Sequence, residues 1–354
     1  MSIKFFRARG GHHCVMTTAD RRHIATWLLA CAGLVYAMVV VGGVTRLTHS
    51  GLSMVEWQPL VGALPPLSEA HWQELFAKYR ETPEFRLVNH AMDLEGFKSI
   101  FWWEYFHRLL GRTIGLVFFL PFALFLVKNK IDKPLFLKLS FIFVLGALQG
   151  ALGWYMVKSG LVDDPRVSHF RLTAHLGVAL AIFAAELWVA LDLLFERNFS
   201  PRGRLETLIP VVVFLMALSG GMVAGLRAGS AYSTFPLMNG YVVPPETLML
   251  DPWWMNFLYN MAAVQLVHRS FFWLLATLIP LAWWRSRGTV QGNVLLGVFI
   301  LQASLGISTL LLHVPVALAA CHQAGAVLLF AASLWAAHGG ARAAAPEYAA
   351  AAAA

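Results

Sequence analysis

Four histidines carry the chemistry that this sequence suggests first: His107, His175, His268 and His322. Each lies near the start of a different hydrophobic stretch, where histidine is rare because a membrane interior solvates it poorly. Imidazole nitrogens bind haem iron and other transition metals. Four histidines in equivalent places therefore predict two pairs of metal or haem ligands.

Two other interpretations of these histidines remain open at this point. Each side chain alone can reach headgroups or water, although four at equivalent places favour ligands. Zinc binds three or four close ligands that usually include cysteine or carboxylate, so two separated pairs suit bis-histidine haem better. The remaining histidines of the connections and span ends are interpreted as structural: His49, His71, His90, His169 and His313.

The elements that must position these residues are membrane-spanning helices. Of 354 residues, 58% are hydrophobic and 13% are charged, and the mean hydropathy is +0.63, which leaves too few polar residues to cover a soluble globule. A span needs about 20 apolar residues. Eight stretches qualify: 24–46, 103–127, 135–157, 170–195, 205–227, 260–284, 290–312 and 316–338. The sequence therefore predicts an all-α integral membrane protein whose first stretch is a retained span.

The net charge of +8 is distributed as in a membrane protein and does not indicate nucleic-acid binding. The positive-inside rule places the connections rich in basic residues, and both termini, in the cytoplasm. These basic residues are Lys4, Arg7, Arg9, Arg21, Arg22, Lys128, Lys130, Lys133, Lys138, Arg197, Arg202, Arg204, Arg285 and Arg287. The connection at 47–98 carries seven carboxylates against four lysines and arginines and faces the outside. Cys14, Cys31 and Cys321 lie outside the outer connections, so no disulfide is expected.

The two halves of the chain resemble copies of one four-helix unit. LQGALG at 148–153 matches LQASLG at 301–306, residues 175–183 match 322–330, and a Gly-Gly pair occurs at 42–43 and at 220–221. Four spans per copy give both copies one orientation, so we expect two tandem four-helix bundles related by a pseudo-two-fold axis along the membrane normal.

The expected organisation follows the repeat. A cytoplasmic leader at 1–23 precedes an N-terminal four-helix bundle at 24–195, which carries an outer loop at 47–98. A C-terminal four-helix bundle follows at 196–338 with an ordered outer loop at 228–258, and an Ala-rich tail occupies 339–354. An amphipathic helix around 69–80 either lies on the membrane surface or caps the first bundle.

The four histidines are expected at one depth near the outer surface, because their helices all run from outside to inside. His107 then pairs with His175, and His268 pairs with His322. Facing ligands in a four-helix bundle can hold a planar macrocycle between them. The prediction is two haems side by side.

Glu104 makes the two predicted sites unequal. It lies three residues before His107, on the same helix face. It is either a proton acceptor beside a reacting macrocycle or a carboxylate paired with Arg108. The matching residue of the second half is Gln265. Five arginines near the outer span ends either pair with haem propionates or reach the headgroups: Arg46, Arg108, Arg112, Arg227 and Arg269.

Several longer motifs occur in order between residues 24 and 338. They are GGVTRLT at 42–48, SGLSMVEW at 50–57, FWWEY at 101–105, HRLLGR at 107–112, FRLTAHL at 170–176, FPLMNG at 235–240 and HQAGA at 322–326. Together they resemble the haem A synthases of the proteobacterial and mitochondrial type. Residues 264–269 match that family more loosely. The chain also lacks the cysteine pair that some members carry in the first outer loop, so an electron route through cysteines is not expected.

The resemblance implies a membrane oxidoreductase that oxidises the C8 methyl group of haem O, through a hydroxymethyl intermediate, to the formyl group of haem A for cytochrome oxidase. By position, it implies that His107 and His175 flank the substrate haem, that His268 and His322 bind a haem b cofactor, and that Glu104 is the catalytic carboxylate. It places the chain in the bacterial inner membrane or its mitochondrial equivalent. Candidate partners are haem O synthase, cytochrome oxidase assembly factors and an electron partner of unidentified class.

Two questions about the chemistry stay open. Two axial histidines leave no iron position for dioxygen, so either one ligand moves away or the methyl is oxidised to a cation that water captures. The alternative function is a bis-haem quinol oxidoreductase or electron-transfer module, in which both haems are permanent. The difference between Glu104 and Gln265 favours the haem O-oxidising enzyme.

Overall fold

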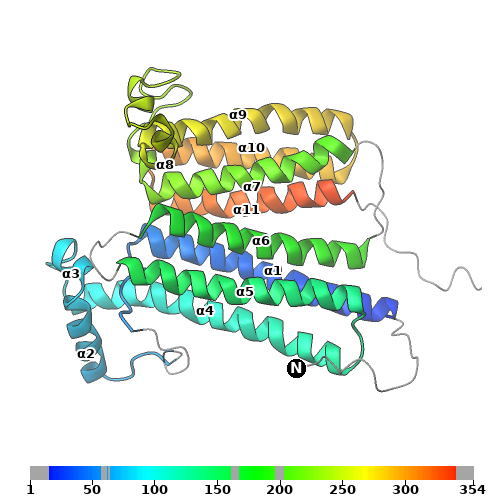
Figure 1. Cartoon of the computed structure of the whole chain (residues 1–354), viewed down its shortest axis with the longest axis horizontal. Helices are drawn as coiled ribbons and strands as arrows, with labels where there is room; N and C mark the ends of the chain where they lie inside the picture. Colours follow the sequence, from blue (N-terminus) through cyan, green and yellow to red (C-terminus); the bar gives the residue numbers. More distant parts are fainter. Residues whose placement is uncertain (1–15, 57–61, 63, 161–166, 196–202, 340–354) are drawn as a thin grey trace, which may run out of the picture.

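The chain folds into a bundle of long helices that run side by side (Figure 1). The computed structural model describes residues 16–56, 62, 64–160, 167–195 and 203–339. Eight helices in these ranges are long and apolar enough to cross a membrane. They are α1 (Thr18–Leu47), α4 (Leu94–Val127), α5 (Lys133–Gly160), α6 (His169–Leu194), α7 (Gly203–Gly225), α9 (Met261–Arg285), α10 (Val290–Leu311) and α11 (Val316–His338). The predicted all-α fold with eight spans is confirmed.

Polar side chains begin several of these helices. Thr17 accepts a hydrogen bond from the backbone N–H of Asp20, whose carboxylate reaches back to Thr17 and forms a capping box for α1. Asp93 caps α4, and Thr289 caps α10. Each cap satisfies a backbone donor that has no partner within the helix. The apolar stretches therefore begin as helices at defined residues.

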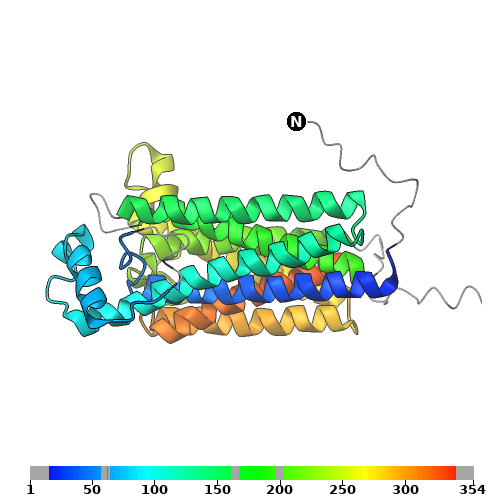
Figure 2. The same ribbon diagram turned by 90° about the horizontal axis from the view of Figure 1, so that it is seen from below.

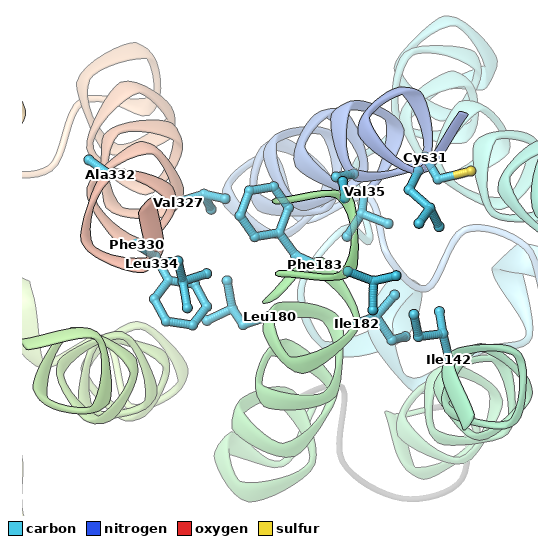
Figure 3. Close-up of a cluster of buried hydrophobic side chains, with 14 of the residues drawn as sticks. Cys31, Val35, Ile142, Leu180, Ile182, Phe183, Val327, Phe330, Ala332 and Leu334 are labelled. Carbon is cyan, nitrogen blue, oxygen red and sulfur yellow. The ribbon is translucent and has the colours of Figure 1, made fainter. Parts of the chain in front are cut away.

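Four helices, α1, α6, α7 and α11, form the centre of the bundle. α1 packs on α4, α6 and α11, and α7 packs on α6, α9 and α11, while α5 lies on α6 and α10 lies on α11. Figure 3 shows the core where α1, α6 and α11 meet, with buried Val35, Phe183 and Phe330. The two halves thus share a pattern of helix neighbours, and the symmetry axis that would relate them stays a prediction.

The first outer connection folds into a cap on α4. It contains α2 (Glu69–Arg80) and α3 (Pro83–Leu87), which extend past the ends of the other helices (Figure 2). Trp72 and Tyr79 of α2 pack with Phe97, Phe101 and Tyr105 of α4. The predicted helix at 69–80 is therefore present and caps the first half. α4 starts at Leu94 rather than near 103, because its first turns bury apolar side chains against α2 instead of lipid.

The second outer connection is an ordered loop, as expected. It contains the short helices η2 (Ala228–Ser230), η3 (Pro245–Leu248), η4 (Trp253–Met255) and α8 (Asn256–Tyr259). Asn256 is fully buried and holds the backbone of Leu250 through hydrogen bonds to its N–H and its carbonyl. The loop is thus tied internally by a buried amide.

The opposite end of the bundle joins the first, third, fourth and last spans. Arg21 at the start of α1 donates to the backbone carbonyls of Asp192 and Leu193 near the end of α6. His338 at the end of α11 and Lys138 of α5 both contact the Asp192 carboxylate. The described ends of the chain therefore meet at one end of the bundle. Several predicted features lie outside the described residues: Lys4, Arg7, Arg9, Cys14, Arg197, Arg202 and the tail from 340 onward.

Candidate functional site

The first histidine pair lies between α1, α4, α5 and α6. An added Cβ on Gly42 of α1 would lie 3.0 Å from Nε2 of His107, and one on Gly153 of α5 would lie 3.0 Å from Cε1 of His175. Each imidazole therefore fills a niche in which an added methyl group would press on the ring. The two rings are close enough to interact electrostatically. The side-chain amide of Gln149 lies 3.4 Å from Nε2 of His175.

The second histidine pair repeats this arrangement between α7, α9, α10 and α11. An added Cβ on Gly220 would lie 3.2 Å from Cε1 of His268, and one on Gly306 would lie 2.6 Å from Cε1 of His322. These two imidazoles also interact electrostatically. The hydroxyl oxygen of Ser219 lies 2.8 Å from Nδ1 of His268.

The four niches lie at a similar depth. Each niche glycine occurs within about two turns of the end of its helix, on the side of the bundle that carries the outer connections. Because every histidine contacts its glycine across a helix interface, the four rings share that level. The structure therefore places His107 and His175 in one half of the bundle and His268 and His322 in the other, and the predicted pairing as haem ligands stays a prediction.

The donor sets in these niches fit a bis-histidine haem. Among the described residues, Nδ1 of His175 is buried without a hydrogen-bond partner, and a bond from this ring to iron would offset part of the cost of burying it. No group of three or more His, Cys, Asp and Glu side chains able to hold an ion occurs in the described ranges. A pair of imidazoles is thus the donor set available at each site, and it suits haem better than zinc.

Glu104 is buried at the outer end of the first site, with an exposed fraction of 2%. One carboxylate oxygen accepts hydrogen bonds from the Ser53 hydroxyl at 2.7 Å and from the Met54 N–H at 2.9 Å. The other forms an ion pair with Arg108 at 2.6 Å. Arg108 also donates to the carbonyls of Met54 and Glu56. Of the two interpretations of Glu104, the pairing with Arg108 is present, and the pair holds the loop at 53–56 against α4; a catalytic role of Glu104 stays a prediction.

Gln265 and Arg269 hold the second connection in place, as Glu104 and Arg108 hold the first. The Gln265 amide donates to the carbonyls of Ala228 and Tyr232, and its oxygen accepts from Arg269 at 3.2 Å. Arg269 donates to the carbonyls of Tyr232 and Thr234. Both halves therefore use a side-chain pair four residues apart to hold an outer connection. They differ in charge, because only the first half has a carboxylate there.

One of the five predicted arginines contacts His49. Arg46 is near the end of α1, and Nη2 of Arg227, which follows α7, lies 3.3 Å from Nδ1 of His49. Burial, together with Arg227 and Arg46, lowers the pKa of His49, so this ring is neutral at pH 7. The guanidinium group of Arg227 suits an anionic group such as a propionate. Arg108 and Arg269 instead hold backbone carbonyls, and Arg112 is partly buried on α4.

The sequence did not single out several residues that contact the histidines. These are Ser219, Gln149 and the four niche glycines. The repeated Gly-Gly and LQxxLG motifs contained the signal, because they include all four niche glycines and align them in two pairs, Gly42 with Gly220 and Gly153 with Gly306. His49 was interpreted as structural, although it lies beside Arg227. The structural interpretation suits His169, whose Nε2 contacts the Leu258 carbonyl at 2.9 Å.

Comparisons with known proteins agree with the motifs. A family model described as "Cytochrome oxidase assembly protein" matches residues 25–334. A protein of Nitrosospira multiformis named heme A synthase is 60% identical over 334 residues, which cover 90% of this chain and 94% of that protein. Proteins with the same name from Nitrosomonas eutropha and Parvibaculum lavamentivorans are 51% and 46% identical, over 90% and 91% of this chain and 94% and 95% of their own lengths.

Proposed function

The chain belongs to the cytochrome oxidase assembly protein family, and on that premise we propose that it oxidises the C8 methyl group of haem O, through a hydroxymethyl intermediate, to the formyl group of haem A. It is a multi-pass membrane oxidoreductase of haem A biosynthesis. The observation that carries the proposal is the pair of histidine sites, equal in their glycine niches and unequal in the charge beside them.

In this proposal His107 and His175 hold the substrate haem O. The carboxylate of Glu104 lies on the same helix as His107, and Arg108 keeps it in place. Conversion of a methyl group and one water molecule to a formyl group releases four protons and four electrons, and an electron acceptor must take up the electrons. A fixed carboxylate beside this site can accept a proton or stabilise positive charge that develops on the substrate.

His268 and His322 hold haem b in the second site. Haem b supplies reversible one-electron transfer when it is bound there. The residues around it are neutral or bind backbone: Gln265 and Arg269 are both occupied with the outer loop. This environment suits a permanent redox group rather than a reacting one, because no carboxylate replaces Glu104.

The proposed setting is the bacterial inner membrane with both termini in the cytoplasm. An even number of spans returns the chain to the side where it began, and basic residues concentrate on that side. The two haem sites then lie near the outer surface. Haem O synthase and cytochrome oxidase assembly factors are the expected partners, since the substrate and product are hydrophobic haems.

Chromatography of extracted haem tests the proposed reaction. The chain is expressed with and without a haem O synthase, and haem is extracted from the purified protein and from membranes. Haem A or hydroxylated haem O is expected only when haem O is made. Only haem b in both conditions would support the quinol oxidoreductase instead.

Histidine variants test the two sites separately. His107→Ala is expected to abolish product while haem b remains, and His268→Ala is expected to lose haem b. The exposed His313 provides a matched control, His313→Ala, that should change neither. Equal loss of both haems in His107→Ala would contradict the assignment of separate sites.

A further inference from the structure

Ser219 of α7 contacts His268 from the turn that also carries the niche glycine. Its oxygen lies 2.8 Å from Nδ1 of His268 and 2.7 Å from the backbone carbonyl of Met216, to which its hydroxyl donates. A hydroxyl has a single proton to donate. When that proton points to Met216, the serine oxygen can only accept from His268, so Nδ1 carries the hydrogen.

Nδ1 of His268 therefore donates to the Ser219 oxygen on α7. The lone pair of the ring is then on Nε2, which is the nitrogen free to bind iron.

In the first site the corresponding helix carries an apolar side chain at the place of Ser219. Gly42 stands in the same relation to His107 as Gly220 does to His268, and the residue before it is Val41, whose side chain has no polar atom. The rings also present different edges. Nε2 of His107 faces the niche of Gly42, whereas Cε1 and Nδ1 of His268 face the niche of Gly220.

We propose that Ser219 is a positioning residue that makes His268 a firmly held ligand, and that Val41 leaves His107 a more readily released one. A ligating histidine whose second nitrogen donates a hydrogen bond is oriented and made more basic, and loss of such a partner typically costs 10–100-fold in metal affinity. A cofactor haem must stay bound, whereas a substrate haem must enter and its product must leave. The proposal rests on the assignment of the two haem sites made above.

The redox potential of haem b in the purified protein tests the role of Ser219. Ser219→Ala removes the acceptor, and a more basic histidine favours the ferric state, so the potential is expected to rise. A tenfold preferential loss of ferric affinity corresponds to about 59 mV for one electron. Ser219→Thr keeps the hydroxyl and should restore the wild-type potential. Ser304→Ala is the matched control, because Ser304 is exposed and bonds only the Ile300 carbonyl of its own helix.

Haem transfer to apomyoglobin tests both halves of the proposal. Ser219→Ala should release haem b at least tenfold faster than wild type. Val41→Thr, which replaces one methyl with a hydroxyl at nearly constant shape, should slow the release of haem from the first site. Unchanged potential and unchanged transfer in Ser219→Ala would overturn the role of Ser219, and unchanged transfer in Val41→Thr would overturn the role of Val41.

The haem content of His268→Ala separates this inference from the function on which it rests. If His268→Ala keeps its haem b, the site assignment itself is wrong. If His268→Ala loses haem b but Ser219→Ala behaves as wild type, only the role of Ser219 is wrong.

Discussion

Replacing Gly306 by alanine is expected to displace His322 and to release haem from the second site. The added Cβ would lie 2.6 Å from Cε1, 3.2 Å from Nδ1 and 3.4 Å from Nε2 of the ring. The ring must move, and overpacking of this kind costs about 1–3 kcal/mol. Alanine gains about 0.5–1 kcal/mol over glycine within a helix. The net loss in free energy of unfolding is therefore about 0–2.5 kcal/mol.

The effect on haem should exceed the effect on folding. A displaced ligand lowers metal affinity about 10–100-fold, by analogy with the loss of supporting hydrogen bonds. This loss corresponds to about 1.4–2.7 kcal/mol. Gly297 lies on the same helix, and nothing lies within 4 Å of its added Cβ. Gly297→Ala should therefore keep full haem content and gain the helix propensity of alanine.

The assay measures haem per protein, by the pyridine haemochrome spectrum, and the thermal unfolding midpoint of each variant. Gly153→Ala and Gly150→Ala repeat the comparison on α5, where only the first would contact a histidine. If Gly306→Ala retained wild-type haem content and gained stability as Gly297→Ala does, the niches would have no part in holding the ligands.

Three further predictions concern the end of the bundle that carries α2 and α3. Glu104→Ala should block product formation while the second haem is retained. Loss of one partner of the buried pair with Arg108 should also lower the free energy of unfolding by about 3–5 kcal/mol, which faster proteolysis of the loop at 53–56 would reveal. Burial and the nearby Glu104 raise the pKa of Glu84 to about 8, from 4.5. The cap should therefore lose stability as pH rises from about 4.5 through 8. In Glu84→Gln the thermal unfolding midpoint should change less with pH over that range. Arg227→Gln should relieve repulsion with Arg46 and raise the unfolding temperature of the haem-free protein, which calorimetry would measure. The same variant should lower haem affinity about tenfold, as expected for a lost charge-assisted bond, and a haem titration would measure this loss.

Hydropathy and charge were sufficient to predict the spans, because membrane-spanning helices satisfy their backbone hydrogen bonds internally and each depends on its own apolar residues. The start of α4 was wrong by several residues for a related reason. Phe97 and Phe101 pack against α2, a contact between segments that a local hydropathy pattern does not contain. The caps at Thr17 and Asp93 are local, and the sequence around them carries that information.

The four histidines, their pairing and the inequality at Glu104 came from the sequence alone, through composition and internal repetition. What those residues contact came only from the tertiary structure. Glu104 binds Ser53 and Met54, about 50 residues away, and His268 binds Ser219 from another helix. Such contacts depend on how helices rotate and approach one another, which is set by side chains distant in sequence. Residue types thus led to the predicted chemistry. Helix packing decided which ring nitrogen of His268 and which carboxylate oxygens of Glu104 contact other segments.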